Sequence, residues 1–260
     1  MINSFKVLDV KLDALEIVEV IKEIEQWINH PNPQAGKYIC VTNVNSVVEA
    51  QKDPYLKQIA NESDLSVCDG MPLVWLGRLK GLELKKRVYG LNLMKNTLEL
   101  SQKKGYANYF YGSSEKVLNN MINKIKKEYP NLKITGYFSP PFRDLSKTEK
   151  QAITENINSL KPDIIWVGLG YPKQEKWMYE FRDHIRCPVL IGVGAAFDFF
   201  SGNKKQAPVW MQNTGLEWLF RLLQEPKRLW RRYLINNTMF IILLIKQGLT
   251  HLFFKRRELR

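Results

Sequence analysis

An acidic residue stands at a point in the chain where a carboxylate can do chemistry. Asp69 follows the apolar run LSVC and precedes Gly70 and a helical pattern that begins near Pro72. A carboxylate within reach of an attacking hydroxyl can act as a general base, and a nearby helix start favours its ionised form. Asp is also a good helix cap. Position alone supports a general base and a helix cap about equally.

A second pair of polar residues ends a neighbouring apolar run. Thr42 and Asn43 follow the run YICV. Their hydroxyl and amide groups can hold a sugar hydroxyl or orient a carboxylate. The alternative is a cap for the helical pattern that starts at Ser46, and position alone slightly favours this cap.

Two loops with glycines follow later apolar runs. The first carries Gly168, Gly170, Lys173 and Gln174, and the second, GVGAAF, carries Gly194. Glycine allows a ligand to approach the backbone, and the start of a helix suits a phosphate. We interpret both loops as nucleotide-contacting, with Lys173 and Gln174 in reach of a pyrophosphate or sugar. An ordinary strand-to-helix turn explains the first loop equally well, and both are weak as nicotinamide signatures.

Metal ligands do not occur at the spacing of a metal site. His30, His184 and His251 are isolated, and the chain has no Asp-x-Asp pair. We therefore expect neither a metal nor a cofactor. If a diphosphate leaves during the reaction, arginine is the natural group to neutralise it, because its planar fork binds phosphate with two hydrogen bonds.

Arginines gather in the stretch EWLFRLLQEPKRLWRRY, residues 217–233. Pro226 is predicted to end one helix and to start the next. In the second helix Arg228, Arg231 and Arg232 fall at i, i+3 and i+4, on one face. The apolar run MFIILLI and the basic run LFFKRR follow. We interpret this part as a membrane-surface segment that also brings arginines to the active site; the alternative is a solvated basic face.

Charge is concentrated at the same end of the chain. The 260 residues carry a net charge of +13, and residues 221–260 hold ten Lys or Arg against two Glu. Such an excess predicts an anionic partner, namely nucleic acid, anionic lipid or a phosphorylated substrate. The longest apolar run, Met239–Ile245, is far shorter than the ~20 residues of a spanning helix. We expect a protein without a secretory signal that touches a membrane without crossing it.

Apolar runs alternate with helical patterns along most of the chain. Strands are expected at Phe5–Val10, Tyr38–Thr42, Leu65–Cys68, Asn108–Gly112, Lys133–Gly136, Ile164–Gly168 and Val189–Gly192. Helices are expected at Ala14–Asn29, Ser46–Gln51, Leu73–Lys80, Leu91–Lys104, Ser114–Tyr129, Lys147–Leu160 and Glu175–Ile185. This order predicts a Rossmann-like α/β fold with a mostly parallel sheet and helices on both faces. Ligands bind beyond the carboxyl ends of such strands.

Composition changes near Ala207, after which the pattern is helical, aromatic and basic. We expect an α/β catalytic core over residues 1–206 and a membrane-associating appendage over residues 207–260, the name kept below. The cysteines Cys40, Cys68 and Cys187 lie in apolar runs without pairing motifs, so we expect reduced core thiols in a cytosolic protein.

A series of stretches resembles the WecG/TagA/CpsF family of bacterial glycosyltransferases over residues 5–234. The stretches are ICVTNVNSVVEA, DLSVCDGMPLVW, RVYG, YFYGSSE, PDIIWVGLGYPKQE, GVGAAFDFFSG and APVWMQNTGLEWLFRLLQEPKRLWRRYL. Each is weak alone, but the full series in this order is highly specific.

The resemblance implies a metal-independent, inverting transfer from a UDP-sugar to a polyprenyl-diphosphate-linked saccharide. Asp69 matches the family's base, Thr42 and Asn43 its polar pair, Arg87 its arginine after the base helix, Gln174 its donor-contacting glutamine, and Arg221, Arg228 and Arg231 its diphosphate-contacting arginines. Many relatives separate the Thr and Asn by one residue, whereas here they adjoin. The number of residues between Asn43 and Asp53-Pro54 is the same as in those relatives, so Asn43 matches the family pattern better than Thr42 does.

Other functions remain open at this point. A basic nucleic-acid-binding protein fits the charge, but the chain shows no recognition motif, so we expect no nucleic acid as a partner. A nucleotide-sugar dehydrogenase or epimerase would need a nicotinamide cofactor. The resemblance favours a cytoplasmic enzyme, peripheral on the inner face of the cell membrane, with a homo-oligomer possible and the sugar drawn from N-acetylmannosamine, its uronic acid or related hexoses.

Overall fold

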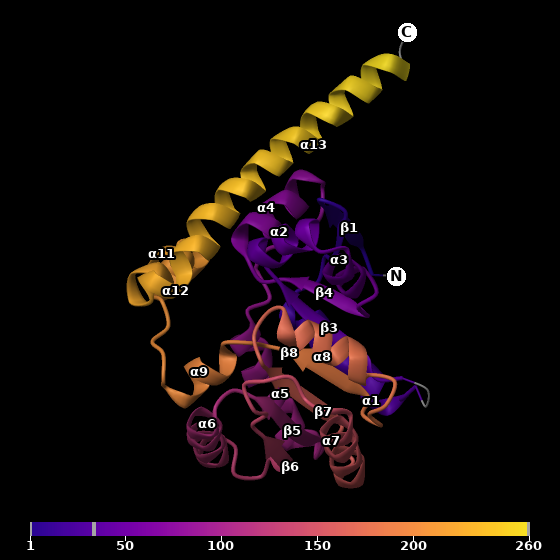
Figure 1. The fold of residues 1–260 in the computed structure, drawn as a ribbon, viewed down its shortest axis with the longest axis vertical. Coiled ribbons are helices and arrows are strands. Elements are labelled where there is room, and N and C mark those ends of the chain that lie inside the picture. The colour runs from indigo at the N-terminus through magenta and orange to yellow at the C-terminus, as the bar shows by residue number, and fades with distance from the viewer. Residues whose placement is uncertain (1, 33–34, 259–260) are drawn as a thin grey trace.

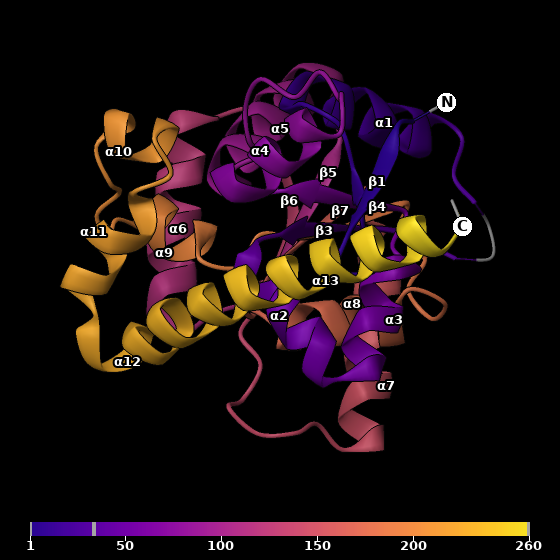
Figure 2. The ribbon, with the colours of Figure 1, turned by 90° about the horizontal axis from the view of Figure 1, so that it is seen from above.

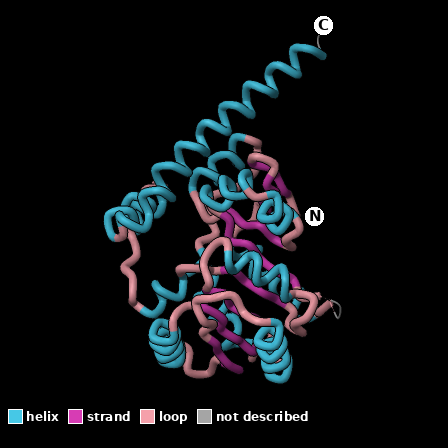
Figure 3. The backbone as a smooth tube through the Cα atoms, in the orientation of Figure 1, coloured by secondary structure: helices cyan, strands magenta, loops and turns pink. Residues whose placement is uncertain are grey.

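A single sheet forms the centre of the molecule. The computed structural model describes residues 2–32 and 35–258. Within them, eight strands lie in the order β1-β2-β4-β3-β8-β7-β5-β6. Neighbouring strands run parallel except β1 and β2, which are antiparallel. Helices pack around the sheet (Figures 1 and 3). The predicted α/β, mostly parallel fold is confirmed.

The elements alternate along the core as expected. The strands are β1 Ser4–Val7, β2 Val10–Asp13, β3 Lys37–Thr42, β4 Leu65–Cys68, β5 Ala107–Gly112, β6 Lys133–Phe138, β7 Ile164–Gly168 and β8 Val189–Gly192. The core helices are α1 Ile17–Asn29, α2 Val44–Lys52, α3 Pro54–Asn61, α4 Met71–Leu79, α5 Gly90–Lys104, α6 Glu115–Glu128, α7 Lys147–Leu160, α8 Lys173–Phe181 and α9 Ala196–Ser201.

The first predicted strand, Phe5–Val10, is wrong as a single strand. The chain turns at Leu8 and Asp9, whose φ angles of 50° and 62° are left-handed. A two-residue turn with both central residues in this region matches the twist of a hairpin, so the run splits into antiparallel β1 and β2. The apolar pattern hid the turn because it lacks the usual Asn-Gly or Asp-Gly pair.

Two core helices, α3 and α9, are not among the helices expected from the sequence. In α3, Pro54 occupies the first turn, and the Asp53 side chain accepts a hydrogen bond from the Tyr55 backbone amide. This is a good helix start. The other, α9, has only six residues and follows the second glycine loop.

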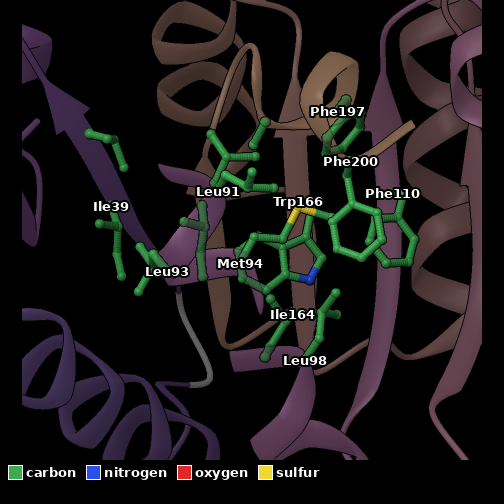
Figure 4. Packing of buried hydrophobic residues seen from close by; sticks show 14 of the residues in the cluster. Ile39, Leu91, Leu93, Met94, Leu98, Phe110, Ile164, Trp166, Phe197 and Phe200 are labelled. Atoms are coloured by element: carbon green, nitrogen blue, oxygen red, sulfur yellow. The ribbon is translucent and has the colours of Figure 1, made fainter. Parts of the chain in front are cut away.

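The central strands are buried on both faces. Figure 4 shows one cluster, in which Trp166 of β7 packs beside Met94, Phe110 and Phe197. The Trp166 indole donates to Asn108 Oδ1 at 2.9 Å, so its polar atom is satisfied inside the core. The three predicted core thiols are buried and unpaired.

The described part of the appendage consists of helices joined by short turns. It comprises α10 Val209–Asn213, α11 Glu217–Gln224, α12 Pro226–Trp230, a π-helical turn η1 Arg231–Ile235, and α13 Asn236–Glu258. Pro226 begins α12, as predicted. Figure 2 shows α13 running across α2. The Asn236 amide bonds Asn45, Glu49 and Lys52, and Phe240 joins an apolar cluster of the core.

No helix in the described ranges is both long and apolar enough to cross a bilayer. The basic run at 255–257 and Arg260, which the sequence assigns to the membrane surface, fall where the structure describes no side chains.

Candidate active site

The candidate residues leave the sheet at neighbouring strand ends. Thr42 of β3 pairs with Cys68 of β4, so the next residues, Asn43 and Asp69, emerge at the same level. The Asp69 amide donates to the Thr42 carbonyl at 2.7 Å, which ties the two ends together. After β4 the chain crosses over β3, β8 and β7 and continues with β5 on the other side of the sheet. Such a reversal of strand order is a topological switch point, and ligands of α/β sheets bind beside it.

A pocket of about 560 Å³ opens at this edge. The core supplies Asn43, Val44, Asn45, Asp69, Gly70, Met71, Pro72, Trp75, Leu76, Leu79 and Arg87. The appendage supplies Gln212, Gly215, Glu217, Trp218, Arg221, Arg232, Tyr233, Asn237, Phe240, Ile241 and Leu244. The pocket is therefore largely apolar but contains five charged residues, and half of its lining comes from the appendage.

Asp69 lies in this pocket with 20% of its side chain exposed. Burial raises the pKa of Asp69 to about 7, against the lowering effects of Arg87, Arg221 and Arg232 and with a further raising effect of Glu217. The sequence predicts that the nearby helix start favours the ionised form of Asp69, and burial in the folded protein acts in the opposite direction. A carboxylate with a pKa near neutrality is better suited to accept a proton at that pH.

Arg87 joins two carboxylates. Its Nη1 lies 3.5 Å from Asp69 Oδ1, and its Nη2 donates to Glu217 in a close ion pair. The guanidinium carbon also lies 4.5 Å from the centroid of the Tyr89 ring. Arg87 is thus held in place beside Asp69 by one residue of the core and one of the appendage.

The two polar residues at the end of β3 differ in position. Asn43 lines the pocket and also caps α2, because its Oδ1 accepts from the Ser46 amide at 3.2 Å. The cap engages the oxygen end of the amide. Thr42 is buried, and its hydroxyl bonds Ser66 at 2.8 Å between β3 and β4. The structure therefore brings Asn43, but not Thr42, to the pocket.

The appendage arginines also divide into two sets. Arg221 and Arg232 line the pocket. Arg228 is 52% exposed and forms an ion pair with Glu225, and Arg231 is exposed beside the Trp230 ring. The predicted helical face of Arg228, Arg231 and Arg232 is not seen as one pocket-facing group, because α12 gives way to a π-helical turn at Arg231.

The glycine loops lie at the ends of β7 and β8, next to the pocket strands in the sheet, but do not line the pocket. Gln174 is buried between them. Its Oε1 accepts from the Gly170 amide at 3.1 Å, and a Cβ on Gly194 would come within 3.3 Å of the same atom. Gly168 is covered by the Phe197 ring, and Lys173 is exposed at the start of α8. The loops form one packed unit around the Gln174 amide.

Three charged residues near these groups were not predicted as site residues. Glu217 and Arg232 line the pocket, and the sequence signal was their place in the arginine-rich stretch. Glu175 is buried behind Gln174, whose amide donates to its Oε1 at 3.0 Å. Burial raises the pKa of Glu175 to about 7. Burial of these residues depends on tertiary packing, which a single sequence does not display.

A larger hollow of about 1180 Å³ lies at the opposite, amino-terminal edge of the sheet, along α7 and α8. None of the predicted site residues lines it, and ligands of such sheets bind at the carboxyl edge. Among the described residues, no three His, Cys, Asp or Glu side chains are grouped to hold a metal ion.

Comparison with known proteins identifies the family. Residues 5–253 match the Glycosyl transferase WecG/TagA/CpsF family. The chain belongs to this family. It is therefore a glycosyltransferase, and in particular a hexosyltransferase, as the resemblance of its motifs implied.

Several named relatives are similar to the chain over most of their length. Three of them are N-acetylglucosaminyldiphosphoundecaprenol N-acetyl-beta-D-mannosaminyltransferases. The Bacillus subtilis enzyme is 36% identical over 76% of this chain and 75% of its own. The Bacillus spizizenii enzyme is 32% identical over 86% of both, and that of Staphylococcus aureus strain MW2 is 26% identical over 88% and 89%.

Proposed function

We propose that this enzyme transfers N-acetylmannosamine from UDP to a polyprenyl-diphosphate-linked N-acetylglucosamine during synthesis of a cell-surface polymer. The names of the three relatives support this acceptor and this sugar. The observation that carries the proposal is the pocket that Asp69 shares with the guanidinium groups of Arg87 and Arg221.

In the proposed reaction, Asp69 takes the proton from the acceptor hydroxyl. The acceptor oxygen bonds to the anomeric carbon while the bond from that carbon to the UDP oxygen breaks, and UDP leaves with the electron pair. Attack from the side opposite UDP inverts the anomeric centre. The raised pKa of Asp69, about 7, supports its role because a base of that strength can accept the proton near neutral pH.

Negative charge builds up on the departing diphosphate, and fixed cations lower the free energy of that state. Arg221 lies in the pocket, and Arg87 is held beside the base. We therefore assign the stabilisation of the leaving group to guanidinium groups and not to a divalent ion. The exposed positions of Arg228 and Arg231 do not support the diphosphate contacts that the family resemblance implied for them.

A membrane position for the enzyme is supported by an apolar surface on the appendage. Exposed apolar residues there are Val209, Trp210, Leu216, Leu219, Leu223, Trp230, Leu234, Ile235, Met239, Ile241, Ile242, Ile245 and Leu249. Trp75 and Leu79 of α4, which are also exposed, line the same pocket as Ile241. Exposed apolar residues in such number on one part of the chain mark an interaction surface. We assign it to the inner face of the cell membrane, next to a pocket that receives a lipid-linked acceptor.

The activity is tested by transfer from a panel of UDP-sugars to a short-chain prenyl-diphosphate N-acetylglucosamine. The panel contains UDP-N-acetylmannosamine, its uronic acid derivative and UDP-N-acetylglucosamine. The proposal expects turnover of the first at least tenfold above the others, retained in the presence of a metal chelator. Turnover of another sugar alone refutes the donor, and loss of activity on chelation that added Mg²⁺ restores refutes the metal-independent mechanism.

Membrane binding is tested by flotation with vesicles that contain anionic lipid. Leu223→Asp on α11 and Ile245→Asp on α13 place charges in the exposed apolar surface and should reduce the bound fraction severalfold. Val18→Asp, an exposed apolar residue on α1, is the matched control. Equal flotation of all variants would contradict a membrane role for the appendage.

A further inference from the structure

Arg232 is a partly buried cation whose Nε is enclosed and has no hydrogen-bond partner in the described ranges. It is the second residue of the π-helical turn η1 and lines the pocket that contains Asp69. Its Nε is fully enclosed, and no group in the described ranges accepts from it. Turns of this kind inside helices often occur at functional sites. A buried donor that lacks a partner in the free protein is a candidate ligand contact.

The neighbourhood of Arg232 is poor in negative charge. Its guanidinium carbon lies 5.8 Å from the centroid of the Tyr233 ring, and no carboxylate of the described residues comes within ion-pair distance of either Arg232 or Arg221. Burial lowers the pKa of Arg232, and the positive charges of Arg221 and Arg228 lower it further, against raising effects of Tyr233 and Asp69. An anionic group that reaches this partly buried cation would stabilise its charge.

The remaining charges of the pocket are already matched. Arg87 is shared between Asp69 and Glu217. With Asp69 ionised, the two carboxylates against three arginines leave one net positive charge, and with Asp69 protonated they leave two. This excess belongs to Arg221 and Arg232, the pair without acidic partners in the described ranges.

The two arginines that the family resemblance implied are differently placed. Arg228 forms an ion pair with Glu225, which also lies 3.3 Å from the Lys204 amino group. Arg231 is exposed, with its guanidinium carbon 5.2 Å from the centroid of the Trp230 ring. Neither lines the pocket.

We propose that Arg232, paired with Arg221, binds the diphosphate group of a substrate in this pocket, whereas Arg228 serves only to hold Glu225. The inference rests on the proposed function for the class of substrate. Both proposed substrates contain a diphosphate: the nucleotide donor and the prenyl-linked acceptor. Two guanidinium groups offer paired donors for its oxygens, and the apolar side chains of Trp75, Phe240 and Leu244 lie in the same pocket.

The test measures binding of UDP, uridine and geranyl diphosphate to the full-length chain in mild detergent. Arg232→Met removes the charge and keeps much of the apolar stem. Arg228→Met tests the family assignment, and Lys227→Met removes an exposed charge from the same helix as a control. Arg232→Lys asks whether charge without the fork suffices. Circular dichroism and thermal melting of each variant establish that it is folded.

Loss of a charge-assisted contact corresponds to about a 10- to 100-fold weaker affinity. We expect this loss for Arg232→Met, partial recovery for Arg232→Lys, and changes within about twofold for Arg228→Met and Lys227→Met. Uridine, which lacks phosphate, should bind all variants alike. A loss confined to UDP assigns the site to the donor, and a loss confined to geranyl diphosphate assigns it to the acceptor.

Arg232→Met binding both diphosphates as tightly as Lys227→Met would overturn the assignment, as would a wild-type chain that binds neither. An equal loss in Arg228→Met would overturn the structural role of Arg228. If diphosphate binding depends on Arg232 but the enzyme turns over no UDP-sugar, the binding site stands and the proposed function is refuted.

Discussion

Arg87 in the core donates to the carboxylate of Glu217 in the appendage, and its other terminal nitrogen lies 3.5 Å from Asp69 Oδ1. The candidate base is thus connected through one guanidinium group to a residue 148 positions away in the sequence. Glu217 raises the pKa of Asp69, and Arg87 lowers it. The proton affinity of the base therefore depends on a contact that exists only when the appendage is docked.

The first prediction concerns Glu217→Gln. Removing this carboxylate eliminates its raising effect on the Asp69 pKa and leaves Arg87 to Asp69 alone. Because Asp69 acts when deprotonated, the rate of transfer rises as pH passes through its pKa, about 7 in the wild type. The rise should move to lower pH in the variant, and the rate at high pH should fall because the base is weaker. The measurement is kcat/KM from pH 5 to pH 9.

Glu225→Gln is the matched control for this experiment. Glu225 also lies in the appendage and is also paired with an arginine, but it does not line the pocket. Its variant should keep the wild-type midpoint. A midpoint that stays fixed or moves upward in Glu217→Gln would contradict the electrostatic connection between Glu217 and Asp69.

The second prediction concerns Asp69→Asn. The amide keeps the size of the side chain but cannot accept the acceptor's proton, so transfer should fall by about 10²–10⁴. UDP affinity should change little, because the donor's phosphate is assigned to arginines. Asp183→Asn, an exposed carboxylate at the far edge of the sheet, should retain full activity. Near-normal turnover by Asp69→Asn would remove Asp69 from the role of base.

The sequence predicted the scaffold of the site well. Apolar runs located β4, β7 and β8 with the bounds observed, and the rule that ligands bind at the carboxyl ends of strands correctly placed Asn43 and Asp69 at one edge. These predictions succeeded because strand burial and strand ends are local properties of the chain. The hairpin at Leu8-Asp9 was not predicted, because its turn requires left-handed φ angles that these residue types rarely adopt.

The chemistry inside the pocket was less predictable. An α-helical spacing put Arg228, Arg231 and Arg232 together, but the π-helical turn and the ion pair with Glu225 separate them. The helix that follows Asp69 predicts an ionised carboxylate, whereas burial in the folded protein is the largest effect on its pKa and raises it. Both outcomes depend on how residues 207–258 pack on the core. The helical periodicity of the sequence gives no information about that packing.

The third prediction concerns the stability effect of Glu175. Its pKa is about 7 in the folded protein because it is buried, against an ordinary value of 4.5. The folded state therefore binds more protons than the unfolded state between these values, and stability falls as pH rises through that window. Above pH 7 the buried charge costs on the order of 3 kcal/mol. Glu175→Gln avoids this cost and keeps an acceptor for Gln174.

Urea unfolding at pH 5 and pH 8 measures this effect. Glu175→Gln should be more stable than the wild type at pH 8, and the difference should shrink at pH 5. Glu180→Gln changes an exposed carboxylate on the same helix and should alter stability little at either pH. A variant that is destabilised at pH 8 would mean that the Glu175 carboxylate makes a favourable interaction in its charged form.

The last prediction concerns the attachment of the appendage to the core. The buried Asn236 amide donates to Asn45 Oδ1 and Glu49 Oε1 at 2.9 Å each and accepts from Lys52 at 3.1 Å. Asn236→Ala removes all three bonds between the appendage and the core, whereas Glu49 and Lys52 keep the ion pair between them. The change should cost about 1 kcal/mol.

Because α13 also helps to hold Arg221 and Arg232 at the pocket, the same change should release the appendage more often, and limited proteolysis should cut it faster. The rate of transfer should fall together with this release. UDP affinity should weaken because both arginines leave the pocket. Thr238→Ala, two residues along the helix and exposed, is the control. If Asn236→Ala accelerates cleavage while full activity persists at early times, the appendage does not complete the active site, and its contribution is limited to stability.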